Sequence, residues 1–232
     1  MLVLKSNHKI GGMPGPRSYG DPCGIARALD RVGERWALLV VRELLLGPKR
    51  FTDLRAGLPE ASPNVLSQRL RDLEDAGVVR RRELPPPSGS TVYELTDWGR
   101  GLEPVILALG RWGSRAPPVP RGELSVDALI LALVTTFDAD AAEGLRARVA
   151  LRLGEDAFEL SVSKRQLAVS REVSGKADAT IATDAPTLRQ LAFGRRELAR
   201  AVRQGEVQVE GDEALAQRFL LLFPRPAPAA IE

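Results

Sequence analysis

Residues 62–84 read SPNVLSQRLRDLEDAGVVRRREL, and this stretch decides how the first half of the chain is interpreted. Ser62 is a candidate N-cap, Pro63 stands at the first helical position and Gly77 follows the end, so the pattern predicts one helix. Three leucines at i, i+4 and i+7 form its inward apolar stripe: Leu66, Leu70 and Leu73. The predicted helix therefore has one face for a core and one face for solvent or a partner.

The outward face of this helix carries side chains that can hydrogen-bond to base edges and phosphates. The outward face carries Asn64, Ser67, Gln68 and Arg71, and the predicted DNA contacts of this segment also include Ser62 and Arg69. A polar face on a surface helix is also compatible with simple solvation, so the neighbouring segments decide between the two interpretations.

The segment after this helix is basic and alternating. VVRRREL (78–84) and TVYELT (91–96) predict two strands around the loop PPPSGS (85–90). Arginines on such a hairpin bind phosphates through charge and counterion release, which anchors a protein without specifying sequence. The predicted backbone contacts are Arg80, Arg81 and Arg82, together with Lys49 and Arg50.

Three helices are predicted upstream. Residues 23–32 have an apolar face and Asp21 as a candidate cap, residues 34–47 are apolar almost all round, and residues 51–58 form a short helix. Short helices, a polar-faced helix and a basic hairpin predict a mainly α winged helix-turn-helix domain over residues 21–115. In that geometry the second helix of the pair enters the major groove of double-stranded DNA.

Residues 21–113 resemble the HxlR family of bacterial winged-helix transcriptional regulators. The resemblance is carried by a Cys that opens the first helix, the helix with Trp36, and the motifs GPKRFTDL (47–54), VLSQRLRDLE (65–74) and YELTDWG (93–99). It implies a homodimer that binds a palindromic operator and controls transcription. It also implies that the first helix and the helix after the hairpin form the contact between subunits.

The residues support such a contact independently. The helix after the hairpin has apolar positions at spacings of 3, 1, 3 and 3, although one small domain leaves it little to cover. The predicted dimer interface comprises Ile25, Leu29, Leu102, Val105, Ile106, Leu109 and Trp112. The alternative is that this stripe belongs to the core of a single subunit.

Cys23 is a candidate redox sensor. It matches the position at which some relatives in the HxlR family sense oxidants, and the start of a helix stabilises a thiolate. The alternative is an inert, small apolar residue.

The scarcity of His and Cys excludes several function classes. With one His and one Cys, the chain cannot supply the roughly four ligands of a Cys/His zinc site. The single His, His8, lies in an aperiodic stretch that offers no place for a catalytic triad. We therefore predict no enzymatic activity, no cofactor and no metal.

The ends of the chain and its location follow from similar reasoning. Residues 1–20 are predicted to be a flexible arm, with Met13 as a candidate start, and residues 225–232 a tail. No apolar run approaches the about 18 residues of a membrane span. A lone Cys fits a reducing compartment, so we predict a cytoplasmic protein without membrane contact.

A Pro-rich segment, APPVPRG (116–122), predicts a linker between two domains. Residues 13–115 contain 16 basic and 13 acidic residues, whereas residues 116–232 contain 15 basic and 17 acidic ones. The positive charge of the chain therefore belongs to the first half, as expected for a domain that binds a polyanion.

Residues 123–224 predict an α+β domain with an antiparallel sheet and helices packed on it. The helix SVDALILALVTTF (125–137) precedes strands such as LRARVALRLG (145–154), and further helices follow. This half resembles the sterol carrier protein type two domain, which implies an apolar tunnel for a hydrophobic small molecule. The predicted lining is Leu133, Phe137, Leu191, Phe193, Phe219 and Phe223, any of which could instead simply fill a core.

The sequence thus predicts a dimeric winged-helix transcriptional regulator that responds to a hydrophobic ligand. Two alternatives remain open. In one, the chain is a lipid or hydrophobic-ligand carrier with secondary DNA contact. In the other, the C-terminal domain is purely structural.

Overall fold

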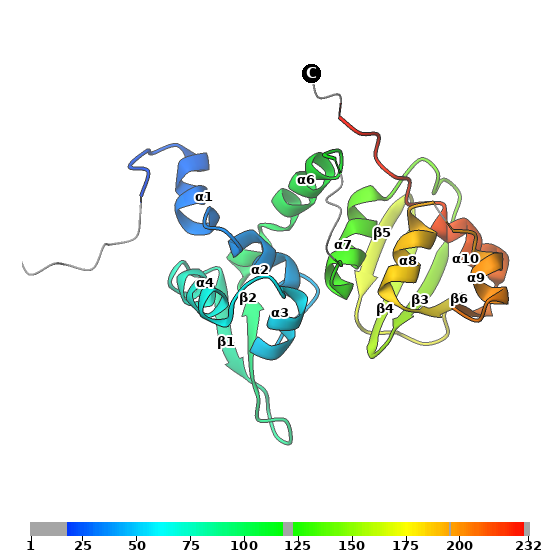
Figure 1. Cartoon of the computed structure of the whole chain (residues 1–232), viewed down its shortest axis with the longest axis horizontal. Coiled ribbons are helices and arrows are strands. Elements are labelled where there is room, and N and C mark those ends of the chain that lie inside the picture. Colours follow the sequence, from blue (N-terminus) through cyan, green and yellow to red (C-terminus); the bar gives the residue numbers. More distant parts are fainter. Residues whose placement is uncertain (1–17, 118–122, 195, 230–232) are drawn as a thin grey trace, which may run out of the picture.

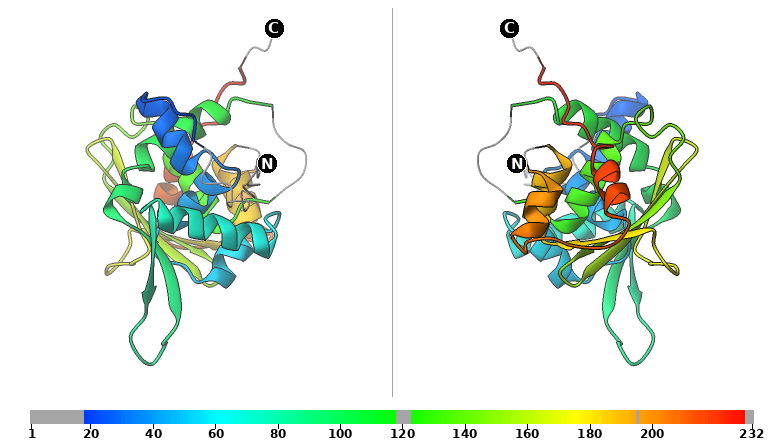
Figure 2. Two further views of the ribbon diagram at one scale, coloured as in Figure 1. Left: turned by 90° about the vertical axis from the view of Figure 1, so that its left-hand side faces the viewer. Right: turned by 90° about the vertical axis from the view of Figure 1, so that its right-hand side faces the viewer.

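The computed structural model describes residues 18–117, 123–194 and 196–229. His8, Met13 and most of the predicted arm and linker lie outside these ranges. A helical domain with a projecting hairpin is followed by a domain built on a sheet (Figure 1). The side views show the hairpin extending away from the rest of the molecule (Figure 2).

The first domain has the predicted order of helices and strands. Its elements are α1 (Gly24–Val32), α2 (Ala37–Leu44), α3 (Phe51–Gly57), α4 (Pro63–Asp75), β1 (Val79–Glu83), β2 (Thr91–Leu95), α5 (Asp97–Arg100) and α6 (Glu103–Gly113). The second helix is shorter than predicted, because Trp36 adopts a left-handed conformation (φ 78°) that separates α2 from the preceding turn. Asp21 does not cap α1 at its first turn; its carboxylate accepts a hydrogen bond from the N–H of Cys23, the N-cap residue, at 2.9 Å.

Helix α4 confirms the prediction made from its caps and leucines. The Ser62 hydroxyl accepts a hydrogen bond from the Val65 N–H at 3.4 Å. Gly77, with φ +71°, ends the helix because its left-handed backbone lets the N–H groups of Gly77 and Val78 bond to the last carbonyls. The inward stripe of Leu66, Leu70 and Leu73 is fully buried.

The C-terminal domain places helices on a five-stranded sheet. Its elements are α7 (Val126–Thr136), β3 (Ala147–Leu153), β4 (Asp156–Ser163), β5 (Gln166–Ser170), β6 (Ala179–Thr183), α8 (Ala185–Ala192), α9 (Leu198–Arg203), β7 (Gln208–Gly211) and α10 (Glu213–Leu220). The strand order is β5-β4-β3-β6-β7. This is the predicted α+β arrangement of a sheet with helices packed on it.

One strand pair differs from the antiparallel pattern, since β3 and β6 run parallel. The chain leaves the edge strand β5 and passes β4 and β3 before it enters β6, so β6 cannot pair as the next strand of a meander. The crossing segment is held by the guanidinium of Arg148, which donates to the Lys176 carbonyl at 2.6 Å, and by Glu159, which accepts the Ser174 N–H at 3.0 Å.

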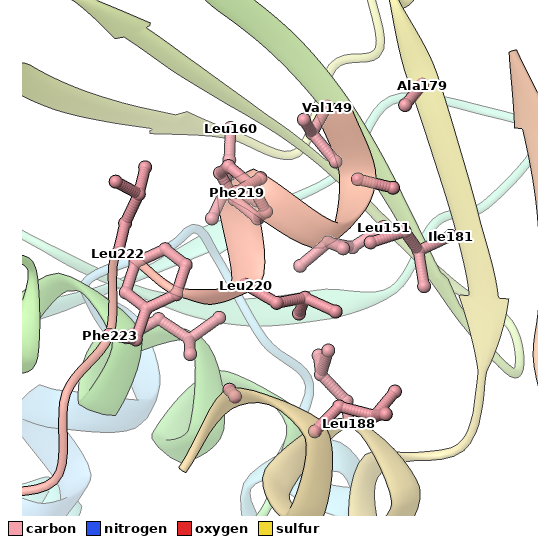
Figure 3. Packing of buried hydrophobic residues seen from close by; sticks show 14 of the residues in the cluster. Val149, Leu151, Leu160, Ala179, Ile181, Leu188, Phe219, Leu220, Leu222 and Phe223 are labelled. Carbon is pink, nitrogen blue, oxygen red and sulfur yellow. The ribbon is translucent and has the colours of Figure 1, made fainter. Parts of the chain in front are cut away.

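The core of the second domain lies between the sheet and its helices (Figure 3). Phe219 and Phe223 of the C-terminal segment pack edge to face, with ring centroids 5.1 Å apart. Leu188 of α8 and Leu151 of β3 belong to the same buried cluster (Figure 3). In the part of the chain that the structure describes, no helix has the length and apolar character required to span a membrane.

Candidate nucleic-acid interface

The polar face of α4 presents the side chains predicted to meet DNA. Ser62, Asn64, Gln68 and Arg71 are exposed, and Ser67 is half-buried. The Gln68 amide is held along the helix, because its Nε2 donates to Asp72 Oδ1 at 2.8 Å and its Oε1 accepts from Arg71 Nη2 at 2.7 Å. A base that bonds to Gln68 has to replace these contacts.

Arg69 does not lie on this face. Its side chain is 14% exposed and its Nη1 contacts Asp72 at 2.9 Å and Glu34 at 3.6 Å. Its Nε is buried and has no hydrogen-bond partner among the described residues. Although the sequence groups Arg69 with the DNA contacts, the guanidinium turns back toward the α1–α2 turn.

The wing, defined as β1, β2 and the loop between them, carries two arginines on one face. Arg80 and Arg82 each donate through Nε to a different oxygen of Glu94, at 2.8 and 3.0 Å. Burial of Glu94 by itself raises the pKa of its carboxyl, but the hydrogen bonds and charges of Arg82 and Arg80 together hold that pKa below its ordinary value. The charged carboxylate fixes both guanidinium groups on one face of the strand.

The third arginine of the wing points to the other face and joins the wing to α4. Arg81 Nε donates to Glu74 Oε1 at 2.8 Å, and this hydrogen bond raises the pKa of the guanidinium. At the tip, Arg50 Nη2 donates to the Ser88 hydroxyl at 3.1 Å, which ties the start of α3 to the wing loop. Sequence reasoning missed Glu94 and Glu74 as anchors, although charges opposite Arg80 in a hairpin register would have indicated the first of them.

Lys49, predicted to contact phosphates, is not brought to this surface. Its ammonium lies at the boundary between the domains, where it pairs with Glu43 and Asp127. Two buried carboxylates without a cation would be strongly destabilising, and Lys49 supplies that cation. The sequence cannot reveal this pairing, because Asp127 lies in the other domain.

The apolar positions predicted for a dimer interface separate into two groups. Leu102 and Ile106 pack against the core of the first domain. The remainder are exposed in the single chain: Ile25 (73%), Leu29, Val105, Leu109 and Trp112 (76%). Exposed apolar residues on α1 and α6 are typical of a surface that a partner covers.

Cys23 is exposed at the N-cap of α1. This is the position at the start of the first helix that the sequence predicts, and its reactivity stays a prediction. No group of three or more His, Cys, Asp or Glu side chains suited to a metal ion occurs within the described ranges.

The residues predicted to line a hydrophobic tunnel lie in the packed core of the second domain. Leu133, Phe219 and Phe223 are fully buried, Leu191 is buried, and Phe137 and Phe193 pack against the same cluster. Two cavities lie elsewhere. One of about 540 Å³ is at the domain boundary, and one of about 510 Å³ is beside Arg148 of β3 and Ser161 of β4. The tunnel lining therefore stays a prediction.

Comparisons with known proteins match the two halves of the chain to two different families. Residues 31–119 match the model of the HxlR-like helix-turn-helix family, and residues 130–223 match that of the SCP-2 sterol transfer family. The uncharacterized HTH-type transcriptional regulator YvaP of Bacillus subtilis is 40% identical over 38% of this chain and 82% of its own length.

Two solved structures are also similar to parts of the chain. The reduced form of the transcriptional regulator YodB from B. subtilis is 32% identical, with a TM-score of 0.37 over 40% of this chain and 92% of that one. An inverting sec-alkylsulfatase from Pseudomonas sp. is 26% identical, with a TM-score of 0.43 over 46% of this chain and 17% of that one.

The helix pair α3–α4, the stripe of buried leucines and the adjoining wing define a winged helix-turn-helix protein of the DNA-binding, transcription-regulating class. Within that class, the chain belongs to the HxlR-like helix-turn-helix family, and it carries a C-terminal SCP-2 domain in addition.

Proposed function

We propose that this protein is a homodimeric, cytoplasmic transcriptional regulator that binds a palindromic operator with α4 in the major groove and the wing along the backbone. The observation that carries the proposal is the exposed polar face of α4 beside a wing in which Glu94 holds Arg80 and Arg82 in place. In a dimer, two such helices engage half-sites about one DNA turn apart, roughly 34 Å.

Selection of bound fragments from a random-sequence DNA library tests this function. We expect enrichment of a palindrome that binds 10³–10⁷-fold more tightly than random DNA, the usual range of specific recognition. Equal affinity for the selected and the random fragments, measured by fluorescence anisotropy at one fixed salt concentration, would overturn the proposal.

Gln68→Ala and Asn64→Ala are each expected to weaken discrimination between the operator and single-base variants by about 1–3 kcal/mol. These side chains lie exposed on α4, and amide side chains read base edges by paired hydrogen bonds. The measurement is a set of anisotropy titrations against each base variant. Equal losses on operator and random DNA would show that neither residue reads bases.

Arg81→Ala is expected to weaken binding to every DNA sequence alike and to flatten the salt dependence by about one unit of slope. The guanidinium is exposed at the junction of the wing and α4, where it pairs with Glu74 and adds positive charge, so we expect it to act on phosphates. Titrations of operator and random DNA at several salt concentrations provide the slopes. A change confined to the operator would assign Arg81 to base recognition instead.

Cys23→Ser is expected to remove any response of operator binding to diamide or hydrogen peroxide. The thiol is exposed at the start of α1, and a disulfide that it forms has to join two subunits or a small thiol, because the chain has one Cys. Anisotropy with oxidant, and non-reducing electrophoresis, compare the two proteins. If wild-type binding ignores oxidants as well, Cys23 is no sensor.

A hydrophobic small molecule bound by the C-terminal domain is our second proposal. Its support is the SCP-2 family match over residues 130–223 together with an apolar cluster that contains three phenylalanines. Titration of operator binding with and without lipid extracted from a bacterial host tests it. A shift in affinity supports ligand control, lipid binding without operator binding supports a carrier, and indifference to lipid supports a purely structural domain.

A further inference from the structure

The boundary between the two domains contains two buried carboxylates. Glu43 of α2 is 0% exposed and Asp127 in the first turn of α7 is 2% exposed. A carboxylate taken out of water is strongly destabilising unless cations and hydrogen-bond donors surround it. The side chains that compensate these two charges therefore form one of the links between the domains.

Lys49 is the cation that joins the two carboxylates. Its Nζ lies 2.8 Å from Glu43 Oε2 and pairs with Asp127 across the boundary, and its side chain is 13% exposed. Ser125, the N-cap of α7, donates to Glu43 Oε1 at 2.7 Å and thereby adds a second bond between the domains. Helix α7 is thus linked to Glu43 of α2 directly by the Ser125 hydrogen bond and indirectly by Lys49, which pairs with Glu43 and Asp127.

The C-terminal side of this cluster is anchored in the sheet. Arg171, just beyond β5, pairs with Asp127 and donates to Asp156 Oδ1 at 2.6 Å. Its guanidinium lies over the buried ring of Phe158, 4.5 Å from the centroid. Arg171 holds Asp127 within the C-terminal domain. A displacement of α7 or the sheet therefore has to move the ammonium of Lys49 as well or break the Lys49–Asp127 ion pair.

The backbone of Lys49 is part of the wing sheet. Its N–H donates to the Tyr93 carbonyl at 3.0 Å, and the Tyr93 N–H donates to the Lys49 carbonyl at 2.8 Å. Tyr93 directly precedes Glu94, which holds the two wing arginines. Arg50, which directly follows Lys49, is the N-cap of α3 and donates a hydrogen bond to Ser88 of the wing loop.

Helix α3 is also close to the cluster. A Cβ at Gly57, the last residue of α3, would overlap the carboxylate of Glu43, so the backbone of α3 lies directly against the buried charge. The cleft of about 540 Å³ at this place is lined by residues of both domains, among them Asp53 of α3 and Asp156 of β4. The cleft therefore lies directly beside the cluster of charges that links the two domains.

We propose that Lys49 is a positioning residue through which the docking of the C-terminal domain holds the wing in its DNA-binding position. In this arrangement the ammonium of Lys49 is held by Asp127 of the C-terminal domain, and the backbone of Lys49 is bonded to Tyr93 of β2. A shift of the C-terminal domain therefore displaces β2. The inference rests on the proposed function for its effect on DNA. The coupling between domain docking and wing order is a property of the protein alone.

Asp127→Asn in the full chain tests the proposal, because Asp127 lies in the C-terminal domain and not among the proposed DNA contacts. We expect operator affinity to fall by roughly 5–150-fold, the usual range of coupling between sites. The slope of affinity against salt is expected to stay unchanged, because no phosphate contact is lost. The amides of Lys49 and Tyr93 are expected to exchange hydrogen faster than in wild type, in the absence of DNA.

Asp140→Asn is the matched control, since it removes an exposed carboxylate that pairs with Arg165 within the same domain. It is expected to leave affinity and exchange unchanged. Lys49→Arg keeps a cation between the carboxylates and is expected to preserve most of the wild-type affinity. If Asp127→Asn does not fold, Ser125→Gly replaces it, because glycine still serves as an N-cap while the bond to Glu43 is lost.

Three results would overturn the proposal. One is wild-type affinity and wild-type exchange at Tyr93 in a folded Asp127→Asn protein. Another is equal effects of Asp127→Asn and Asp140→Asn. The third is a Lys49→Met protein whose salt slope flattens by about one unit while Tyr93 exchange stays as in wild type, since that marks a direct phosphate contact. If wild-type protein selects no operator, the proposed function fails, and exchange at Tyr93 still decides the coupling.

Discussion

Trp112→Glu is expected to yield a folded monomer that binds operator DNA about 10²–10⁴-fold more weakly than wild type. Trp112 is exposed on α6 and makes little contact with its own domain, so a charge there does not disturb the core. A charge within an apolar contact between subunits does disfavour the dimer. Because a separate protein molecule then has to bind the second half-site, the gain from linked binding is lost.

Sedimentation equilibrium and operator titrations measure this result together. Leu221→Glu is the matched control, because Leu221 is an equally exposed apolar residue in the C-terminal domain, outside α1 and α6. That variant is expected to remain dimeric and to bind the operator normally. A dimeric Trp112→Glu protein with unchanged affinity would place the subunit contact elsewhere.

Phe219→Ala is expected to lower the free energy of unfolding of the C-terminal domain by about 3–5 kcal/mol. The ring is fully buried and packs edge to face on Phe223, so its removal leaves a cavity as well as a loss of apolar burial. All three tryptophans, Trp36, Trp98 and Trp112, belong to the first half of the chain. Tryptophan fluorescence therefore follows the first domain, and an unfolding transition seen by circular dichroism but not by fluorescence belongs to the second.

The size of this loss distinguishes a core from a ligand pocket. Phe193→Ala is the control. Phe193 is only partly buried at the end of α8, so its substitution is expected to lower the free energy of unfolding by less than Phe219→Ala does. A loss below about 1 kcal/mol for Phe219→Ala, together with weaker binding of a hydrophobic ligand, would assign Phe219 to a tunnel wall. A decrease of about 3–5 kcal/mol in the free energy of unfolding, with unchanged binding of the hydrophobic ligand, supports a packed core.

The local features of the winged helix-turn-helix domain could be predicted from the sequence, because each of them is encoded within a few residues. The α4 helix follows from Ser62, Pro63, the leucine repeat and Gly77, and the structure confirms each role. The alternation in 145–154 likewise predicts β3, whose apolar side chains are buried. Such patterns fix secondary structure because caps and periodic burial act on neighbouring residues.

The contacts that charged side chains make in the folded protein could not be predicted in the same way. Arg69 shares its helix with Gln68, yet it turns toward Glu34 and Asp72 instead of the outer face. The parallel pairing of β6 with β3 similarly depends on a crossing segment held by Arg148 and Glu159. In each case the deciding partner is distant in sequence, so no local pattern contains it.

The sequence by itself determined that the chain has a winged helix-turn-helix domain followed by a sterol-carrier-like α+β domain, since periodicity, caps and family motifs are local. The tertiary structure alone decided that Lys49 pairs with carboxylates of both domains. Its ammonium pairs with Asp127, 78 positions further along the chain, in a second domain. The physical reason is that buried carboxylates require a cation, and only folding shows which cation lies within reach.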